Sequence, residues 1–403
     1  PADYVVAIAK DLDALSPEMW SLAERERLRS VENLEPDDLW FFGKFGRDRI
    51  VAEQQASARR FGVDFFFQSE RTFHQAGLVD AIIELLQSEG LTVRDGDAIA
   101  LSPEVSAEED KARILRRSDG RPTYFGADII YHFAKFRHAD HAIDILGPDH
   151  HGYVARVRTM AELWKRLYGK SGFTAILARL EELGLEGPLE WAGSDVSIEV
   201  LIAQQVTLVR AGETVSLSKR AGHILTLDEI VDEVGVDAAR FFFIMLAPES
   251  PLTFDLELAL KQSNENPVYY VQYGHARIAS LIAHARSDPA TAAFVDEAQA
   301  GRYLDRLVHP AELALARRLA DWPRVVASAA KLHAAHHLST YAREVASDFH
   351  QFYTSCTIVD RNDPETSAAR LALSLATRSV LANVLTICGV SAPEFMERRT
   401  VQE

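Results

Sequence analysis

Tyr124 and Asp128 stand four residues apart in a segment of helical periodicity, so both lie on one face of the expected helix. An acidic group beside a phenol could bind a cationic substrate through charge-assisted hydrogen bonds. Tyr and Asp at this spacing also form ordinary surface pairs. The pair taken alone therefore leaves a binding role and a plain surface role open.

A second candidate is the loop Ser216–Gly222, in which Ser218, Lys219 and Arg220 lie among small residues. Small residues let the main chain approach a phosphate. The compact ammonium of Lys219 could neutralise the charge that develops on a triphosphate during phosphoryl or nucleotidyl transfer. The alternative is an exposed basic turn after a hairpin.

Five histidines within 20 residues raise the question of a metal site: His132, His138, His141, His150 and His151. Zinc needs three or four ligands that converge from fixed positions, and this spacing matches no common metal-binding pattern. We expect no protein metal site. His132, His138 and His141 are expected to be partly exposed histidines of helices, whereas His150 and His151 follow a predicted strand.

That predicted strand is Ile143–Gly147, a mostly apolar run whose one polar member is Asp144, and which reads as a buried strand. Helices are expected before it, over about 126–137, and after it, over about 153–168. Alternation of strands and helices indicates a parallel, doubly wound α/β sheet, in which ligands bind at the carboxyl ends of strands. Asp149, His150 and His151 would then lie at a ligand-binding edge.

The later elements are predicted from turn and capping residues. Residues 204–217 alternate apolar and polar side chains around Ala211-Gly212-Glu213, which indicates a hairpin. Thr226 and Glu229 form a capping-box pattern, so a helix should begin at Leu227. From about residue 264 the pattern is helical, with Pro267 in a first turn, and we predict an all-helical bundle over 264–403.

The composition is that of a globular protein: 403 residues, 47% hydrophobic and 25% charged. No run of about 20 apolar residues occurs, so no membrane partner is expected. Cys356 and Cys388 predict two buried thiols in a reducing, cytoplasmic compartment. Residues 261–403 hold 15 Lys or Arg and 15 Asp or Glu, so the whole net charge of −16 lies in residues 1–260. This shift marks a candidate domain boundary.

Taken together, these segments resemble arginyl-tRNA synthetases, which belong to class I of the aminoacyl-tRNA synthetases. Ser218-Lys219 is similar to the end of the class signature Lys-Met-Ser-Lys-Ser. The other similar segments are Ser118–Tyr124, Leu146–Val154, Val234–Phe243, Phe254–Ala259, Ser263–Ile278 and Gly389–Met396. The resemblance implies a helical insertion over 1–111, the second half of a Rossmann-type catalytic domain over 112–263, and a helical anticodon-binding domain over 264–403.

The resemblance also implies roles for single residues. Tyr124, Asp128 and His150 would bind substrate arginine, with Asp128 pairing with the guanidinium. Asp149, His151, Ser218 and Lys219 would bind ATP, accompanied by Mg²⁺, and Lys219 with Ser218 would act in catalysis. Tyr273, His275 and Arg277 would contact tRNA(Arg). Two departures are that His150 stands where many members have Gln, and Ser216 where the first signature lysine is usual.

The implied activity is that of a monomeric arginine–tRNA ligase, which activates arginine with ATP and transfers it to the 3′ end of tRNA(Arg). However, no His-x-Gly-His sequence, the other signature of class I, occurs in the chain. The sequence resembles the C-terminal two-thirds of a synthetase, beginning after the first half of the catalytic fold. The alternatives are a tRNA-binding fragment or paralogue without catalysis and, less favoured by Asp128, a class I synthetase for another amino acid.

Overall fold

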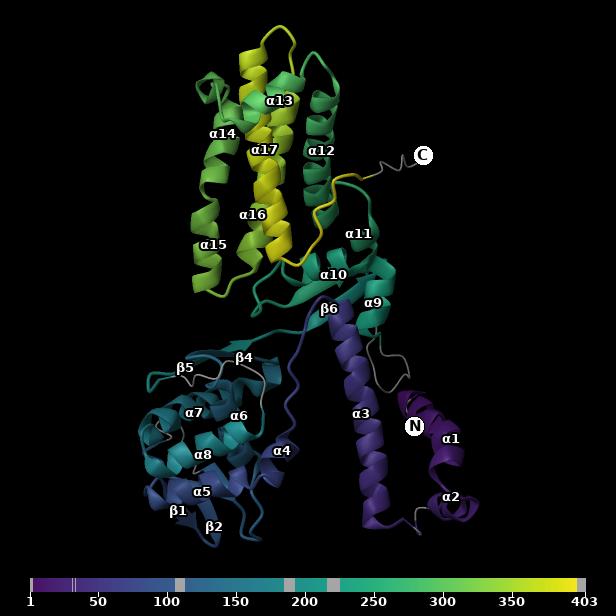
Figure 1. Ribbon diagram of the computed structural model, residues 1–403, viewed down its shortest axis with the longest axis vertical. Coiled ribbons are helices and arrows are strands. Elements are labelled where there is room, and N and C mark those ends of the chain that lie inside the picture. Colours follow the sequence, from purple (N-terminus) through teal and green to yellow (C-terminus); the bar gives the residue numbers. More distant parts are fainter. Residues whose placement is uncertain are drawn as a thin grey trace. The chain divides into compact units, whose positions relative to one another are not determined.

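The computed structural model describes residues 3–30, 32, 34–105, 113–184, 193–215 and 225–396 (Figure 1). The chain divides into two compact units. The α/β unit comprises Phe66–Gln205 and Pro248–Pro251, and the bundle unit comprises Pro1–Phe65, Val206–Ala247 and Leu252–Glu403. Each unit has its own apolar core.

The α/β unit contains short helices and two small sheets. Its elements are α4 (Glu70–Gln75), α5 (Leu78–Ser88), β1 (Thr92–Asp95), β2 (Ala98–Leu101), β3 (Arg113–Arg116), α6 (Tyr124–Lys135), β4 (His141–Leu146), a 3-10 helix (Pro148–Tyr153), α7 (Val154–Leu167), α8 (Ser171–Glu182) and β5 (Ser197–Ile202). Strands β1, β2 and β3 form an antiparallel sheet, whereas β4 and β5 are parallel.

The core of the α/β unit lies between its helices. Trp164 of α7 is fully buried and meets Phe133 of α6 and Phe173 of α8 edge-on, with ring centroids 5.4 Å and 5.1 Å apart. Such edge-to-face pairs stabilise a core beyond the burial of their area. They hold α6, α7 and α8 together, and α6 carries Tyr124 and Asp128.

Strand β4 begins at His141, two residues earlier than predicted, and its burial differs from the expectation. Asp144 is only 9% exposed, while Ile143 and Ile145 are 39% and 70% exposed. Successive side chains of a strand point to opposite faces, and the face that carries Ala142 and Asp144 is the buried one. The prediction of a buried apolar run was therefore wrong: the one polar residue of this run is its buried member.

The bundle unit begins with α1 (Asp3–Met19), α2 (Leu22–Leu28) and α3 (Pro36–Arg60). It continues with β6 (Val206–Arg210), β7 (Glu213–Thr214), α9 (Leu227–Val234), α10 (Val236–Phe243), β8 (Leu252–Asp255) and α11 (Leu256–Leu260). The helices α12 (Pro267–Ser287), α13 (Ala292–Gln299), α14 (Pro310–Ala320), α15 (Trp322–Lys331), α16 (His336–Ser355) and α17 (Pro364–Ile387) complete it, with a 3-10 turn at Leu304–Arg306.

The predicted local signals of this unit are confirmed. Strands β6 and β7 pair as an antiparallel hairpin around Ala211 and Gly212, which both have positive φ, as a two-residue turn requires. Thr226 caps α9 by accepting from the main-chain N–H of Glu229, and the Glu229 carboxylate accepts from the N–H of Thr226 at 2.7 Å. Pro267 occupies the first turn of α12.

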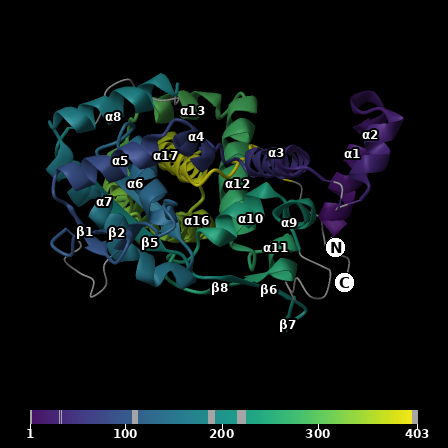
Figure 2. The same ribbon diagram turned by 90° about the horizontal axis from the view of Figure 1, so that it is seen from below.

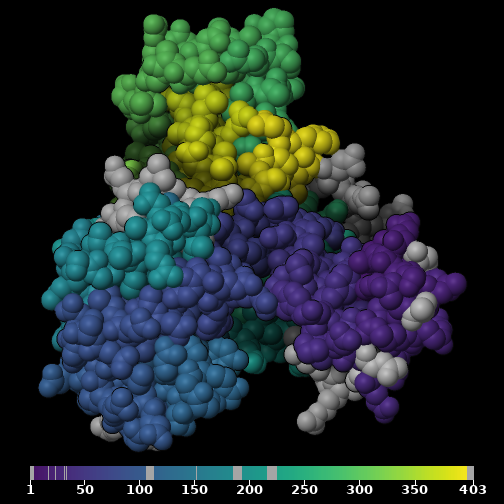
Figure 3. All heavy atoms as spheres, turned by 60° about the horizontal axis from the view of Figure 1, so that its bottom comes forward, coloured from purple at the N-terminus to yellow at the C-terminus, as the bar shows by residue number. Residues whose placement is uncertain are grey.

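Helices α12, α13, α16 and α17 gather closely when the bundle is viewed near its axis (Figure 2). Phe349 and Phe352 of α16 and Leu371, Leu381 and Leu385 of α17 are fully buried. Helix α17, yellow in Figure 3, is long and apolar enough by composition to cross a membrane, but this single helix supplies residues to the bundle core. Cys356 and Cys388 are free, buried thiols, as predicted.

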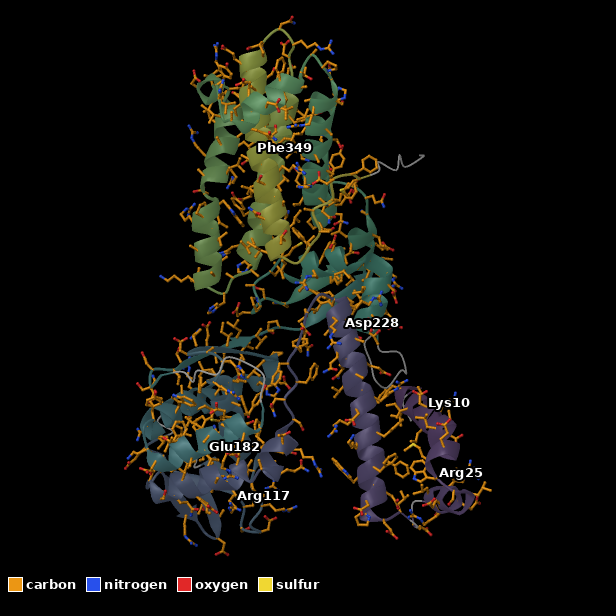
Figure 4. All side chains as sticks on the ribbon, in the orientation of Figure 1. Lys10, Arg25, Arg117, Glu182, Asp228 and Phe349 are labelled. Carbon is orange, nitrogen blue, oxygen red and sulfur yellow. The ribbon has the colours of Figure 1, made fainter. Side chains whose placement is uncertain are left out.

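Helix α3 contacts α9 through a set of polar side chains. Asp228, labelled in Figure 4, accepts a hydrogen bond from Ser57, and Arg60 lies 3.3 Å from its other carboxylate oxygen. Arg60 also pairs with Asp232, and Arg240 of α10 donates to the carbonyl of Phe61 at 2.7 Å. These contacts hold the C-terminal end of α3 against α9 and α10 within the bundle unit.

The compact units do not follow the predicted boundaries at 111/112 and 263/264. The chain instead passes between units after Phe65, after Gln205 and around Pro248–Pro251. The core of the helical bundle continues into α10, β6 and β8 through Phe241, Leu208 and Phe254, so these segments pack with residues far along the chain. Composition changes along the chain, whereas a unit is defined by which side chains share a core.

Candidate functional site

The first turn of α6 carries the two residues that the sequence singled out. Tyr124 is 76% exposed, and Asp128, one turn later on the same face, is partly buried. The hydroxyl of Thr123 donates to the carbonyl of Ile114 at 2.6 Å and so holds the start of α6 against β3. An exposed phenol and a half-buried carboxylate thus lie on one face of a well-packed helix.

Asp128 is surrounded by charged and polar groups from α4, the 3-10 helix, α7 and its own helix α6. The hydroxyl of Tyr153 donates a hydrogen bond to its carboxylate. Burial raises the pKa of Asp128, and the negative charge of Glu70 on α4 raises it further. His132, Lys135 and Arg156 lower that pKa in part, through their positive charge. A cation that enters beside Asp128 would relieve the repulsion between the two carboxylates.

Beneath Asp128, His132 bridges α6 to β4. It is 2% exposed, its Nδ1 lies 2.7 Å from the main-chain oxygen of Asp128, and its Nε2 lies 3.0 Å from a carboxylate oxygen of Asp144. Lys135 donates to the other oxygen of Asp144 at 2.5 Å. The expectation that His132 is a partly exposed histidine was therefore wrong, because this pairing lets it be buried. His138 and His141 are exposed, but neither lies on a helix as predicted: His138 is in the turn after α6, and His141 begins β4.

The 3-10 helix after β4 carries Asp149, His150 and His151. Asp149 and His150 are exposed, with 3.8 Å between the Asp149 carboxylate and Nε2 of His150. The His150 ring meets the Tyr153 ring edge-on, with centroids 6.1 Å apart. The chain thus brings His150, Tyr153 and Asp128 together at the carboxyl end of β4. The side chain of His151 is outside the described part of the structure.

Ser216, Ser218 and Lys219 lie in residues 216–224, outside the described residues. The elements before and after them are described. The hairpin β6–β7 precedes this segment, and the Thr226-capped helix α9 follows it.

Helix α12 distributes its three predicted tRNA contacts over two environments. Tyr273 and Arg277 are partly exposed, with the Arg277 guanidinium 4.0 Å from the centroid of the Tyr353 ring. His275 is 2% exposed, and its Nδ1 lies 2.9 Å from the carbonyl oxygen of Pro393, so we leave it out of the tRNA surface. Side chains two positions apart on an α-helix point about 200° apart around the helix axis. His275 is two positions from both Tyr273 and Arg277, so it faces the opposite side of α12.

Aromatic rings extend the surface around Tyr273. Tyr269 stacks on Tyr273 with an interplanar angle of 8°, and the His350 ring of α16 lies 6.1 Å from Tyr273. Burial lowers the pKa of His350, so this ring is held in its neutral form. We call Tyr269, Tyr273, Arg277, His350 and Tyr353 the α12–α16 aromatic surface.

Three residues near Asp128 were missed by sequence reasoning: Glu70, His132 and Tyr153. Tyr153 and His132 lie in segments that the sequence singled out, but their spacing from Asp128 does not reveal that they contact it. Glu70 belongs to α4, 58 positions before Asp128. Only the packing of α4 and the 3-10 helix against α6 brings Glu70 and Tyr153 to Asp128.

The helical bundle matches a known domain family. Residues 271–396 match the family described as the DALR anticodon binding domain. Together with the α/β unit, this match fits the class I aminoacyl-tRNA synthetase architecture that the sequence resembles.

The chain is similar in sequence to arginine–tRNA ligases, as its motifs predicted. It is 39% identical to the arginine–tRNA ligase of Syntrophotalea carbinolica over 93% of this chain and 62% of that protein. It is 38% identical to the arginine–tRNA ligase of Bordetella avium over 98% of this chain and 64% of that protein. The chain thus spans less than two thirds of these curated relatives.

Solved structures share the fold. A structure from Campylobacter jejuni described as an arginyl-tRNA synthetase matches with a TM-score of 0.75 at 23% identity, covering 98% of this chain and 76% of that one. The arginyl-tRNA synthetase of Thermus thermophilus matches with a TM-score of 0.60 at 20% identity, covering 92% and 68%. At this identity the likeness concerns the fold alone.

Proposed function

We propose that this chain carries the arginine-binding and tRNA-binding parts of an arginine–tRNA ligase. In that reaction the arginine carboxylate attacks the α-phosphate of ATP, which gives arginyl-adenylate and releases pyrophosphate. The 3′-terminal ribose hydroxyl of tRNA(Arg) then attacks the arginyl carbonyl, and AMP leaves. The observation that carries the proposal is the half-buried carboxylate of Asp128, with Glu70 facing it, in a relative of arginine–tRNA ligases.

In this proposal the guanidinium of arginine pairs with Asp128. A guanidinium presents two parallel N–H donors to a carboxylate, which a single ammonium cannot do. Tyr153 already donates to Asp128 and so orients the carboxylate. Glu70 adds a second negative charge, and the exposed ring of Tyr124 offers a flat surface beside the guanidinium. His150 would contact the same substrate from the 3-10 helix.

ATP is proposed to bind with Mg²⁺ at the carboxyl end of β4, near Asp149 and His151, and at the segment of Ser218 and Lys219. The ammonium of Lys219 would stabilise the negative charge that builds up as pyrophosphate leaves. Catalysis would then consist of positioning and charge stabilisation, without a covalent enzyme intermediate. The chemistry of small residues and a lysine supports this assignment.

The α12–α16 aromatic surface is proposed to meet tRNA. Half-exposed rings can stack on unpaired bases, and the Arg277 guanidinium can add a phosphate or stacking contact. We propose the predicted domain boundaries, 1–111, 112–263 and 264–403, as functional parts rather than compact units. We also propose a cytoplasmic monomer, in keeping with the likeness to arginine–tRNA ligases.

A second candidate function is tRNA binding without catalysis, which the lack of a His-x-Gly-His sequence favours for these 403 residues. Arginine-dependent exchange between ATP and pyrophosphate, assayed with tRNA present, separates the two. Robust exchange would exclude the binding-only alternative. Equilibrium dialysis with labelled arginine tests the substrate: we expect binding of arginine but not of citrulline, its uncharged analogue. Equal binding of both would contradict the proposed role of Asp128.

A further inference from the structure

His132 lies between two oxygen atoms that act as hydrogen-bond acceptors. Nδ1 is 2.7 Å from the main-chain oxygen of Asp128, and Nε2 is 3.0 Å from the Asp144 carboxylate. The ring is 2% exposed, so water cannot replace either contact. Both nitrogens therefore depend on these two partners.

The second acceptor is an ionised carboxylate. Burial alone raises the pKa of Asp144, but the hydrogen bonds from His132 and Lys135 lower it below its ordinary value. Lys135 donates to the oxygen that His132 does not use, at 2.5 Å. An ionised carboxylate has no proton to donate to His132.

The protonation of His132 follows from these partners. A neutral imidazole carries one N–H, so one of the two contacts would set a nitrogen lone pair against an oxygen. An imidazolium donates at both nitrogens and satisfies both oxygens. It also gives the buried Asp144 a charged partner on each side, His132 and Lys135.

We propose that His132 is held as an imidazolium and is a positioning residue for the arginine site. One N–H holds the main chain at Asp128, and the positive charge keeps the Asp128 carboxylate ionised when no substrate is bound. The proposal rests on the proposed function, because it needs Asp128 to bind a cation. It adds a residue that does not touch the substrate but sets the charge of the residue that does.

The charged groups around Asp128 and His132 explain why the positive charge of His132 matters for Asp128. Asp128 is faced by Glu70 from α4, by Arg156 from α7 and by Lys135 and His132 from its own helix. His132 is faced by Asp144 from β4, by Lys135 and by the ring of Tyr131. This set holds three carboxylates and three cations. Loss of the imidazolium charge leaves the carboxylates in excess, so Asp128 would take up a proton more readily.

The test compares the pH dependence of arginine binding in the full chain and in His132→Gln. Glutamine can keep one hydrogen bond but cannot carry the charge. We expect the loss of arginine binding on acidification to begin at higher pH in His132→Gln, with affinity about tenfold lower at mildly acidic pH, because Asp128 takes up a proton more readily without the nearby positive charge. The matched control is Phe133→Leu, a neighbouring change on α6 at a fully buried ring that packs on Trp164 and Phe173.

A purely structural role predicts a different result. His132→Gln and Phe133→Leu would then both lower the melting temperature and leave the pH profile of arginine binding unchanged, which would overturn the positioning role. Failure of the wild-type chain to prefer arginine over citrulline would instead overturn the proposed function, and the positioning role with it.

A second measurement does not depend on the variant folding. In wild-type chain labelled with ¹⁵N-histidine, NMR should show His132 protonated at both ring nitrogens at neutral pH, while exposed histidines such as His138 are neutral. A neutral His132 ring would overturn the proposal. This measurement thus tests the protonation state of His132 independently of arginine binding.

Discussion

Helices α6 and α12 both carry residues that the sequence assigned to a substrate, yet they are built differently. On α6, the face of Tyr124 and Asp128 lies above the buried charges of His132, Lys135 and Asp144. On α12, the face of Tyr273 and Arg277 lies against aromatic rings, and the buried face is tied to the C-terminal segment by hydrogen bonds from Gln272 and His275 to main-chain carbonyl oxygens. One site is supported by charge, and the other by ring packing.

This difference predicts which substitutions should have the largest effect near each helix. A buried ion pair is strongly destabilising when one partner is removed, because the other charge is left unpaired. Stacked rings on a half-exposed surface lose only their contact area and a modest pairwise attraction. Charge-removing changes near α6 should therefore have larger effects than truncations on the exposed face of α12.

The largest effect is expected for Asp144→Asn, which leaves His132 and Lys135 facing a neutral amide. We expect a loss of about 3 kcal/mol in the free energy of unfolding at neutral pH, measured by urea denaturation. The lowered pKa of Asp144 means that its stabilisation is complete above the ordinary value of 3.8 and is lost as pH falls through the lowered pKa. The difference in the free energy of unfolding between wild type and Asp144→Asn should therefore narrow only in strong acid. A difference that already narrows between pH 7 and pH 5 would contradict the lowered pKa of Asp144.

Asp128→Asn should come next, and it should act on binding rather than on stability. Loss of a charged pair with the guanidinium is expected to weaken arginine binding about 100-fold, since hydrogen bonds to charged groups contribute about 1.5–3 kcal/mol. Isothermal titration calorimetry measures the affinity. Asp95→Asn, an exposed carboxylate on β1, is the control that should bind like wild type. If Asp128→Asn binds arginine with unchanged affinity, Asp128 does not contact the substrate.

His275→Ala should separate the two faces of α12. Removing a buried ring that hydrogen-bonds to the Pro393 carbonyl should cost about 2 kcal/mol of stability, seen as a lower melting temperature. Affinity for tRNA(Arg), measured well below that temperature, should not change. His284→Ala, an exposed histidine on the last turn of the same helix, should alter neither quantity. A large loss of tRNA affinity in His275→Ala would return His275 to the tRNA surface.

Arg277→Ala should have the smallest effect, of about 1 kcal/mol, and it should fall on tRNA binding. The guanidinium lies over the Tyr353 ring and is partly exposed, so its removal should weaken tRNA(Arg) binding several-fold and reduce the salt dependence of binding. Filter binding at several salt concentrations measures both. Arg286→Ala, at the far end of α12, serves as the charge-matched control. Equal losses in both variants would indicate general electrostatic attraction instead of a local contact.

Local sequence patterns predicted several helices and strands well. The capping box at Thr226, the hairpin at Ala211-Gly212 and the proline at the start of α12 each depend on residues within a few positions, and all three are confirmed. The spacing of Tyr124 and Asp128 likewise predicted a shared face, because helical rotation per residue does not depend on the rest of the fold.

The predictions that failed concern which face is buried. The apolar run Ile143–Gly147 predicted a buried strand, and His132 was expected to be a partly exposed histidine of a helix. The structure reverses both, because Asp144 and His132 are hydrogen-bonded to each other between β4 and α6 and are therefore both buried, while Ile143 and Ile145 face outward. A burial pattern based on single side chains cannot anticipate a pair whose members are 12 positions apart.

Short-range patterns in the chain were enough to predict the family resemblance, the helices and hairpin, and the residue types that could bind a guanidinium, a phosphate or a base. These properties depend on side-chain chemistry and on short-range periodicity. Packing in space, in contrast, places Glu70, Tyr153 and His132 around Asp128, turns His275 inward while Arg277 stays accessible, and buries Asp144. These depend on how elements distant in the sequence pack, because burial and electrostatic pairing are set by neighbours in space.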